Sequence, residues 1–96
     1  MLFEWDAAKD RSNRKKHTGI DFETASRVFA DSGSRSRIER VVGDETRWQT
    51  IGLVGGELLL VAHTWEEHDG EEIVRIISAR KANKHEGRRY FQQADE

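Results

Sequence analysis

The chain has 96 residues, which is enough for one domain with a modest hydrophobic core and leaves no room for a second. It contains no cysteine, so a disulfide framework, a thiolate metal site and a thiol nucleophile are excluded. The start of the chain is acidic, unlike a secretion signal, and the longest apolar stretch, residues 58–62, is too short to span a bilayer. We therefore expect a cytoplasmic protein with no membrane contact.

Charge is segregated along the chain, although the formal net charge is only −2. Residues 9–17 carry five cations and one anion, residues 75–90 carry six cations and one anion, and residues 57–72 carry six anions and no cation. Such blocks give a nearly neutral protein a basic face for a polyanion such as a nucleic acid. Alternatively, each block is only the solvated outer face of a helix.

A short strand ending at Trp5 and two short helices are predicted for the first third of the chain. Asp6 can accept hydrogen bonds from the first turn of one helix, which Gly19 then ends, and Asp21 can cap the next. The apolar side chains of this second helix fall at helical spacing: Phe22, Ala25, Val28 and Phe29.

Four antiparallel strands are predicted next, because Gly and Asp pairs punctuate the sequence at hairpin spacing. The strands would cover residues 37–42, 47–54, 58–65 and 73–79. A basic helix over residues 81–94 follows. The sequence thus predicts a single α+β domain over residues 1–96, with a short N-terminal strand and two helices packed on a four-stranded antiparallel sheet, followed by a C-terminal helix.

The predicted turns also fix cross-strand neighbours, since they pair residue 54 with 57 and residue 68 with 71. Arg47, Thr64 and Arg75 would then form one row, in which the two arginines bind a phosphate or pair with the flanking Glu45 and Glu66. The opposite face would carry Trp48, His63, Trp65, Ser78 and Arg80. Arg80 would join Arg75 only where the chain bends near residues 78–79.

The junction between the last strand and the terminal helix is a candidate anion site. Arg80 and Lys81 lie there, where free amides at the start of a helix also attract anions. Glu86 either orients an arginine, acts as a base, or forms an ordinary ion pair. Along the helix, Lys84 and Arg88 extend the basic side, and Tyr90 is a packing anchor with a polar tip.

The histidines show no metal-binding spacing, and no cofactor motif is present. His63 interrupts an apolar strand, where it either transfers protons or donates one hydrogen bond in the core. His17 either acts in catalysis or complements the C-terminal dipole of the first helix. Among the chemistries left to so small a protein is RNA cleavage, because RNA supplies its own nucleophile, the 2′-hydroxyl.

The sequence resembles the BrnT toxins of bacterial type II toxin–antitoxin systems over nearly its whole length. Three blocks carry the resemblance: Phe3-Glu4-Trp5-Asp6 with Lys9, Asn13 and Lys16-His17; Gly43-Asp44-Glu45-Thr46-Arg47 with Gly52; and residues 75–82 (RIISARKA) with Glu86 and Tyr90. The last block is the most specific. One departure is Thr18, an extra residue within the family's usual Lys-His-Gly-Ile run.

The resemblance implies a RelE-like ribonuclease that cleaves RNA without a metal and arrests translation. It also implies a cognate BrnA-like antitoxin of the ribbon-helix-helix class, through which the complex binds operator DNA. Residue by residue, it assigns phosphate and transition-state contacts to Arg47, Arg75, Arg80 and Lys81. Glu86, His63 and His17 are the candidates for proton transfer, and Lys84, Arg88 and Tyr90 are expected to help bind substrate.

Two other functional hypotheses remain open at the level of sequence. The chain is alternatively an inactive binding module whose basic face pairs with an antitoxin or another acidic partner and contributes to operator DNA binding. A structural dimerisation partner that uses the strand edge at residues 37–42 is a third hypothesis.

Overall fold

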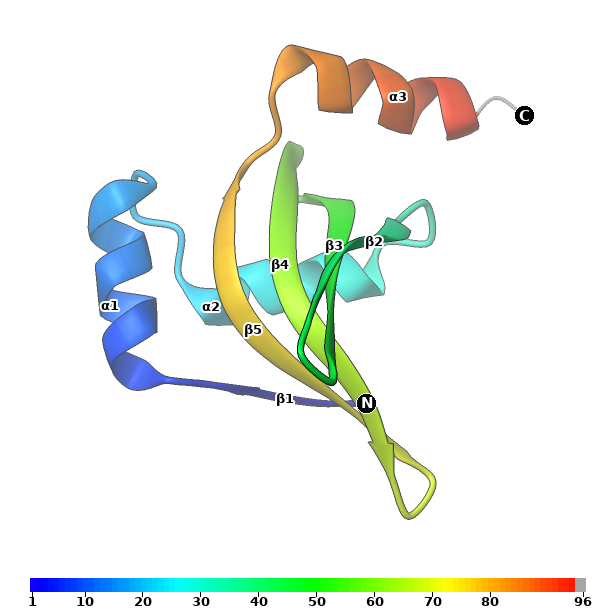
Figure 1. Ribbon diagram of the computed structural model, residues 1–96. Helices are drawn as coiled ribbons and strands as arrows, with labels where there is room; N and C mark the ends of the chain where they lie inside the picture. The colour runs from blue at the N-terminus through cyan, green and yellow to red at the C-terminus, as the bar shows by residue number, and fades with distance from the viewer. Residues whose placement is uncertain (95–96) are drawn as a thin grey trace.

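Five strands run through the protein in the spatial order β1-β5-β4-β3-β2, as seen in the computed structural model, which describes residues 1–94 (Figure 1). The strands are β1 (Leu2–Trp5), β2 (Arg35–Val42), β3 (Glu45–Val54), β4 (Glu57–His68) and β5 (Glu71–Lys81). The helices are α1 (Ala7–Lys16), α2 (Phe22–Ser26), the 3-10 helix η1 (Arg27–Ala30) and α3 (Lys84–Ala94). The predicted α+β class and the order of elements are confirmed.

The sheet has one strand more than predicted, because β1 belongs to it. β1 runs parallel to β5, with Phe3 opposite Val74 and Glu4 opposite Arg75. The other neighbouring strands pair antiparallel, as expected. A parallel partner is reached through a long connection rather than a hairpin, so no turn signal marks it in the sequence.

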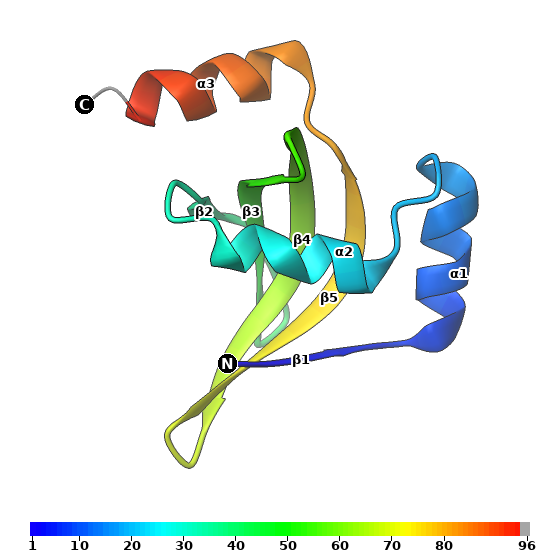
Figure 2. The same ribbon diagram turned by 180° about the vertical axis from the view of Figure 1, so that it is seen from behind.

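The hydrophobic core lies between one face of the sheet and the segment formed by α2 and η1, which crosses that face (Figure 2). Phe22, Ala25 and Val28 are fully buried there, as the predicted apolar face requires. Gly52 of β3 allows the close approach, since a Cβ at this position would lie 2.7 Å from the carbonyl oxygen of Val28. We call the opposite side of the sheet the open face.

Both predicted N-caps are present. The carboxylate of Asp6 accepts from the backbone N–H of Ala8 and Lys9, and that of Asp21 accepts from Thr24 N–H. The hydrogen bond from Lys9 N–H is the largest cause that lowers the pKa of Asp6, and the hydrogen bond from Thr24 N–H is the largest cause that lowers the pKa of Asp21. After α1, Thr18 and Gly19 both adopt positive φ, 53° and 81°, which reverses the chain toward α2.

β5 contains a β-bulge at Ile77. Before the bulge, Ile76 lies opposite His63; after it, Ser78 lies opposite Ala62, so Ile77 is an extra residue. An extra residue reverses the alternation of side chains between the two faces of a strand.

The bulge decides where the two arginines of β5 point. Ile76 and Ala79 are both buried on the core side, whereas Arg75, Ser78 and Arg80 are directed to the open face. The prediction that Ser78 and Arg80 face away from Arg75 is therefore wrong. The bulge takes the place of the bend that was expected at residues 78–79.

The end of β5 is held by a side chain of α1. Asn13 is buried and accepts from the backbone N–H of Ala79 at 3.1 Å, while its Nδ2 donates to the carbonyl oxygens of Ala79 at 2.9 Å and Ile20 at 3.0 Å. β1 pairs with β5 only as far as Ile76. Asn13 thus supplies the hydrogen bonds that a longer β1 would have supplied.

Candidate functional site: a basic groove at the end of β5

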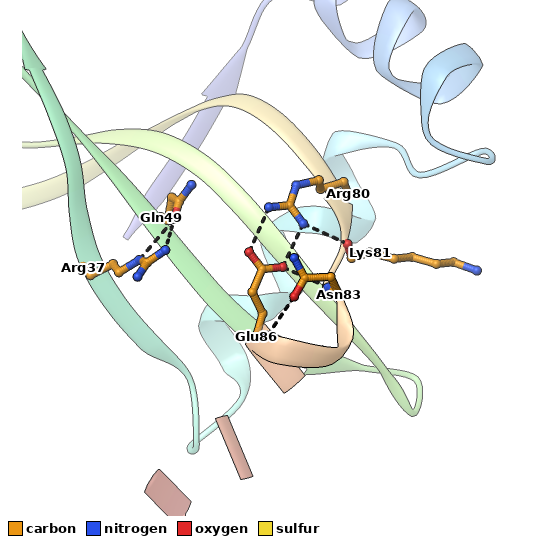
Figure 3. A network of polar contacts seen from close by, with 6 residues as sticks. All are labelled: Arg37, Gln49, Arg80, Lys81, Asn83 and Glu86. Atoms are coloured by element: carbon orange, nitrogen blue, oxygen red, sulfur yellow. Dashed lines mark hydrogen bonds and ion pairs between the residues drawn. The ribbon is translucent and has the colours of Figure 1, made fainter. Parts of the chain in front are cut away.

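An ion pair joins the end of β5 to the first turn of α3 (Figure 3). Arg80 Nη1 donates to Glu86 Oε1 at 2.8 Å, and Arg80 Nη2 donates to Glu86 Oε2 at 2.9 Å. The Glu86 side chain is 15% exposed and that of Arg80 is 39% exposed. This bidentate geometry is the strong form of an arginine–carboxylate contact. Arg80 Nη1 also donates to the Lys81 carbonyl oxygen at 3.2 Å.

The same carboxylate caps α3. Glu86 Oε1 accepts from the Asn83 N–H at 2.9 Å, and Asn83 Oδ1 accepts from the Glu86 N–H at 2.8 Å, so the two residues form a capping box. The hydrogen bond from Arg80 is the main cause that lowers the pKa of Glu86, and it also raises the pKa of Arg80. Glu86 is therefore an ionised carboxylate at neutral pH.

A groove of about 120 Å³ lies beside this ion pair on the open face. Its lining combines cations, polar groups and apolar side chains: Arg35, Ser36, Arg37, Gln49, Ile51, Leu60, Glu86, Arg89 and Tyr90. The apolar side chains come from the middle strands and from α3, whereas the arginines come from β2 and α3. The groove therefore offers an apolar floor between basic walls.

Arg37 and Gln49 form the wall of the groove on the β2 and β3 side (Figure 3). Arg37 Nε and Nη2 both donate to Gln49 Oε1, at 3.2 and 3.1 Å. The charge of Arg37 also contributes to the lowered pKa of Glu86, after the contributions of Arg80 and the capping hydrogen bond. Arg37 on β2 therefore stabilises the negative charge of Glu86, which lines the groove from α3.

Tyr90 anchors α3 over the groove. The residue is 5% exposed, and its hydroxyl donates to Asp31 Oδ2 at 2.5 Å. Asp31 also accepts from the backbone N–H groups of Gly33 and Leu53. Burial opposes ionisation of Asp31, but these hydrogen bonds outweigh it and lower its pKa. The hydrogen bond to Asp31 raises the pKa of Tyr90 to about 12, so the phenol stays protonated. The expected packing role of Tyr90 is confirmed.

The row of Arg47 and Arg75 lies outside the groove. Thr64 and Arg75 are paired as predicted. Arg75 Nη1 lies 3.6 Å from Glu4 of β1, the partner that could not be foreseen without the parallel strand. Arg47 Nε lies 3.5 Å from Glu45, which is the ion pair expected as the alternative to phosphate binding. This nitrogen forms no hydrogen bond within residues 1–94.

Lys81 is the last residue of β5 and does not lie in the terminal helix, which begins at Lys84. We expected free N–H groups at the start of the terminal helix to bind an anion together with Arg80 and Lys81. This expectation is wrong, because the side chains of the capping box already accept from N–H groups at the start of α3. Lys81 Nζ lies 3.7 Å from Glu57 and points away from the Arg80–Glu86 pair (Figure 3). Lys84 and Arg88 are exposed on α3 and do not line the groove.

His63 lies in the core, with no exposed surface. Its Nδ1 lies 3.0 Å from the Thr64 carbonyl oxygen. A carbonyl oxygen can only accept a hydrogen bond, so Nδ1 carries the proton. Nε2 is then unprotonated and accepts from the Thr50 hydroxyl at 2.7 Å. Burial lowers the pKa of His63 despite the opposing effect of the Thr64 hydrogen bond. The position of His63 favours a structural role. His17 ends α1 and does not line the groove.

Sequence reasoning missed several residues of the groove, above all Arg37, Gln49 and Arg89. Arg37 and Gln49 are cross-strand partners in the β2–β3 hairpin, so counting outward from the Gly43-Asp44 turn would have paired them approximately. A bulge between Ile38 and Arg40 shifts that count by one residue. Nothing in the sequence marks Arg89 apart from the basic character of the helix.

Two features are absent from residues 1–94. None of their helices combines the length and the apolar character needed to cross a membrane. No group of three or more His, Asp or Glu side chains is placed to hold a metal ion in this part of the chain.

Comparison with known proteins identifies the family. A search of curated proteins finds no match. A family model described as the ribonuclease toxin BrnT of type II toxin–antitoxin systems matches residues 5–86, which run from the end of β1 through Arg80 to Glu86. Because the match covers most of the chain, this protein belongs to the BrnT family of ribonuclease toxins of type II toxin–antitoxin systems.

Proposed function

We propose that the chain is an endoribonuclease that cleaves RNA without a metal ion and thereby inhibits translation. The observation that carries the proposal is the Arg80–Glu86 ion pair beside a basic groove on the open face, in a member of a ribonuclease toxin family. A guanidinium paired with a carboxylate at a groove mouth supplies both a cation for a phosphate and a proton acceptor.

The proposed reaction uses the 2′-hydroxyl of RNA as the nucleophile. A substrate phosphate competes with Glu86 for Arg80 and releases one carboxylate oxygen, which takes the proton of the 2′-hydroxyl. The 2′-oxygen bonds to phosphorus, the bond to the 5′-oxygen breaks, and this oxygen takes a proton from water. The products are a 2′,3′-cyclic phosphate and a free 5′-hydroxyl.

Cations around the groove stabilise the charge that develops on phosphorus in this scheme. Arg80 is paired with Glu86, and Arg89 lines the groove together with Glu86. Fixed donors aimed at developing charge are the largest single contribution in many enzymes. Arg47, Arg75, Lys81, Lys84 and Arg88 lie beyond the groove, and we assign them contacts with more distant phosphates of the strand.

A type II system pairs its toxin with a protein antitoxin, and we propose that the partner here is a BrnA-like ribbon-helix-helix protein. The antitoxin would neutralise the toxin in the cytoplasm, and the complex would reach operator DNA through the antitoxin. The open face suits this arrangement, because the groove is accessible at the surface of the toxin.

The chemistry of the RNA ends tests this function. The purified chain is incubated with RNA in the presence of a chelator, and the 3′ ends are analysed by mass spectrometry. We expect 2′,3′-cyclic phosphates and no loss of rate on chelation. Salt-dependent RNA retention without any cleavage would contradict the proposal and support a binding module instead.

A further inference from the structure

The Arg37–Gln49 wall presents only hydrogen-bond donors to the groove. An arginine side chain has no acceptor, so the oxygen of Gln49 must face Arg37, and the assignment of its amide is not ambiguous. Gln49 Nε2 is then directed away from Arg37 (Figure 3), and both hydrogen bonds of the Gln49 side chain within residues 1–94 are made by Oε1. Arg37 likewise keeps N–H groups that Gln49 does not use.

The space beside this wall suits a flat, partly apolar group. Across the sheet from Gln49 lie Ala62 and then Ser78, whose small side chains leave the open face uncovered. Ile51 and Leu60 form an apolar floor next to them. A phosphate would gain nothing from such a floor, whereas an unpaired nucleobase has apolar faces and a polar edge.

Resting on the proposed function, we infer that the groove holds one unpaired base of the RNA and that Gln49, together with Arg37, selects a base with two adjacent acceptors. Guanine offers O6 and N7 side by side, which is the pair that an arginine or another double donor reads. Cytosine offers N3 and O2. On its N7 edge adenine places a donor, N6, beside its acceptor, and in uracil an N–H separates the two acceptors.

Replacing the donor of Gln49 by an acceptor should change which base the groove prefers, rather than only weaken RNA binding. Gln49→Glu keeps the contact with Arg37 and nearly the same shape, but it replaces the free donor by an acceptor. Glutamate and Arg37 then present an acceptor next to a donor, which matches N6 and N7 of adenine. The preferred base should change from guanine to adenine.

The test measures binding without cleavage. Short 2′-O-methyl oligonucleotides that differ at one central position, which is guanine, adenine, cytosine or uracil, are titrated by fluorescence anisotropy. The wild-type chain should bind the guanine oligonucleotide about tenfold more tightly than the adenine one. Gln49→Glu should reverse this order, and Gln49→Met, which has no donor, should abolish it. If the wild type also prefers cytosine over uracil, the same two donors recognise the adjacent acceptors of a pyrimidine, which supports the inference.

The matched control is Gln92→Glu, the same change on the exposed side of α3 outside the groove, and it should bind like the wild type. Circular dichroism establishes that each variant is folded. An unchanged order of bases in folded Gln49→Glu and Gln49→Met would overturn the inference. A wild-type chain that prefers guanine but cuts no RNA would contradict only the proposed function, since these oligonucleotides cannot be cleaved.

Discussion

Arg80 and Glu86 are joined by two nearly parallel hydrogen bonds, of 2.8 and 2.9 Å, between the end of β5 and the first turn of α3. The pair serves the fold and the site at once. It ties the first turn of α3 to the end of β5, and it holds a guanidinium beside Glu86, which lines the groove. Because Glu86 also caps α3, any substrate that draws Arg80 away leaves the helix start intact.

Glu86→Gln should lower the rate of RNA cleavage by a factor of about 10² to 10³, because the amide cannot accept the 2′-hydroxyl proton. RNA affinity should not fall, since Arg80 is released from a competing charge. Single-turnover cleavage and anisotropy measure the two quantities. Glu57→Gln, which removes the partner of Lys81 outside the groove, is the matched control. A Glu86→Gln variant with undiminished cleavage would exclude Glu86 as the base.

The wild-type rate should also be insensitive to mild acid. The hydrogen bond from Arg80 lowers the pKa of Glu86, so the carboxylate stays ionised until the pH falls below the ordinary carboxyl range. The lowered pKa of Glu86 also stabilises the folded protein. This stabilisation is present above the pKa that Glu86 has in the unfolded chain and is lost as the pH falls through its pKa in the folded chain. The pH profile of kcat/KM reports the free enzyme, in which Arg80 still binds Glu86, and therefore measures the effect. An inflection above the ordinary carboxyl pKa would count against it.

Asn13→Ala should destabilise the protein by about 3 kcal/mol, because it leaves buried backbone groups of Ala79 and Ile20 without partners. Asn13→Asp should also destabilise, since it keeps only the contact with the Ala79 N–H. Urea unfolding followed by circular dichroism gives both values. Ser12→Ala, at the exposed neighbouring position, should change little. Equal stability of all three variants would mean that β5 needs no support from α1.

Tyr90→Phe should lower the free energy of unfolding by about 2 kcal/mol, because Asp31 loses its phenolic donor. The folded pKa of Tyr90 is raised to about 12, so the stabilisation is complete below the unfolded value of about 10 and is lost as the pH rises toward 12. Denaturant titrations at neutral and alkaline pH test both statements. If the free energies of unfolding of wild type and variant differ by the same amount at both pH values, the hydrogen bond between Tyr90 and Asp31 is not the source of the stabilisation.

His63 should make the fold acid-sensitive at a pH above the range in which carboxylates titrate. Its pKa is lowered by burial, so the unfolded chain takes up a proton before the folded one does, and stability falls as the pH drops below about 6.5. His63→Gln should remove this slope between about pH 6.5 and 5 without abolishing cleavage by the folded protein. His85→Gln, on the exposed side of α3, should retain it. The same slope in His63→Gln would contradict the assignment.

Much of the fold follows from local sequence signals. Asp6 and Asp21 cap their helices as expected, and the apolar spacing from Phe22 onward marks the face that packs on the sheet. The turns at residues 55–56 and 69–70 fix the registers of β3, β4 and the first half of β5. Each of these features depends on residues that are close together in the sequence.

The features that the sequence did not reveal depend on distant or irregular contacts. The pairing of β1 with β5 joins the first and the last strand of the chain and explains why Glu4, rather than Glu66, meets Arg75. The bulge at Ile77 reverses which residues share a face, and no turn residue announces it. It places Arg80 on the open face, so the site depends on a single inserted residue.

The most direct test of the central claim compares Arg80→Ala with Arg75→Ala, which alter two arginines on the same face of β5. Arg80 is paired with Glu86, which lines the groove, and Arg75 is paired with Glu4 away from it. Single-turnover cleavage of RNA is measured for both variants after thermal unfolding has established that each is folded. Arg80→Ala should lower the rate constant by about 10² to 10³, and Arg75→Ala should weaken RNA binding severalfold with little effect on that constant. Cleavage at the wild-type rate by Arg80→Ala would contradict the account.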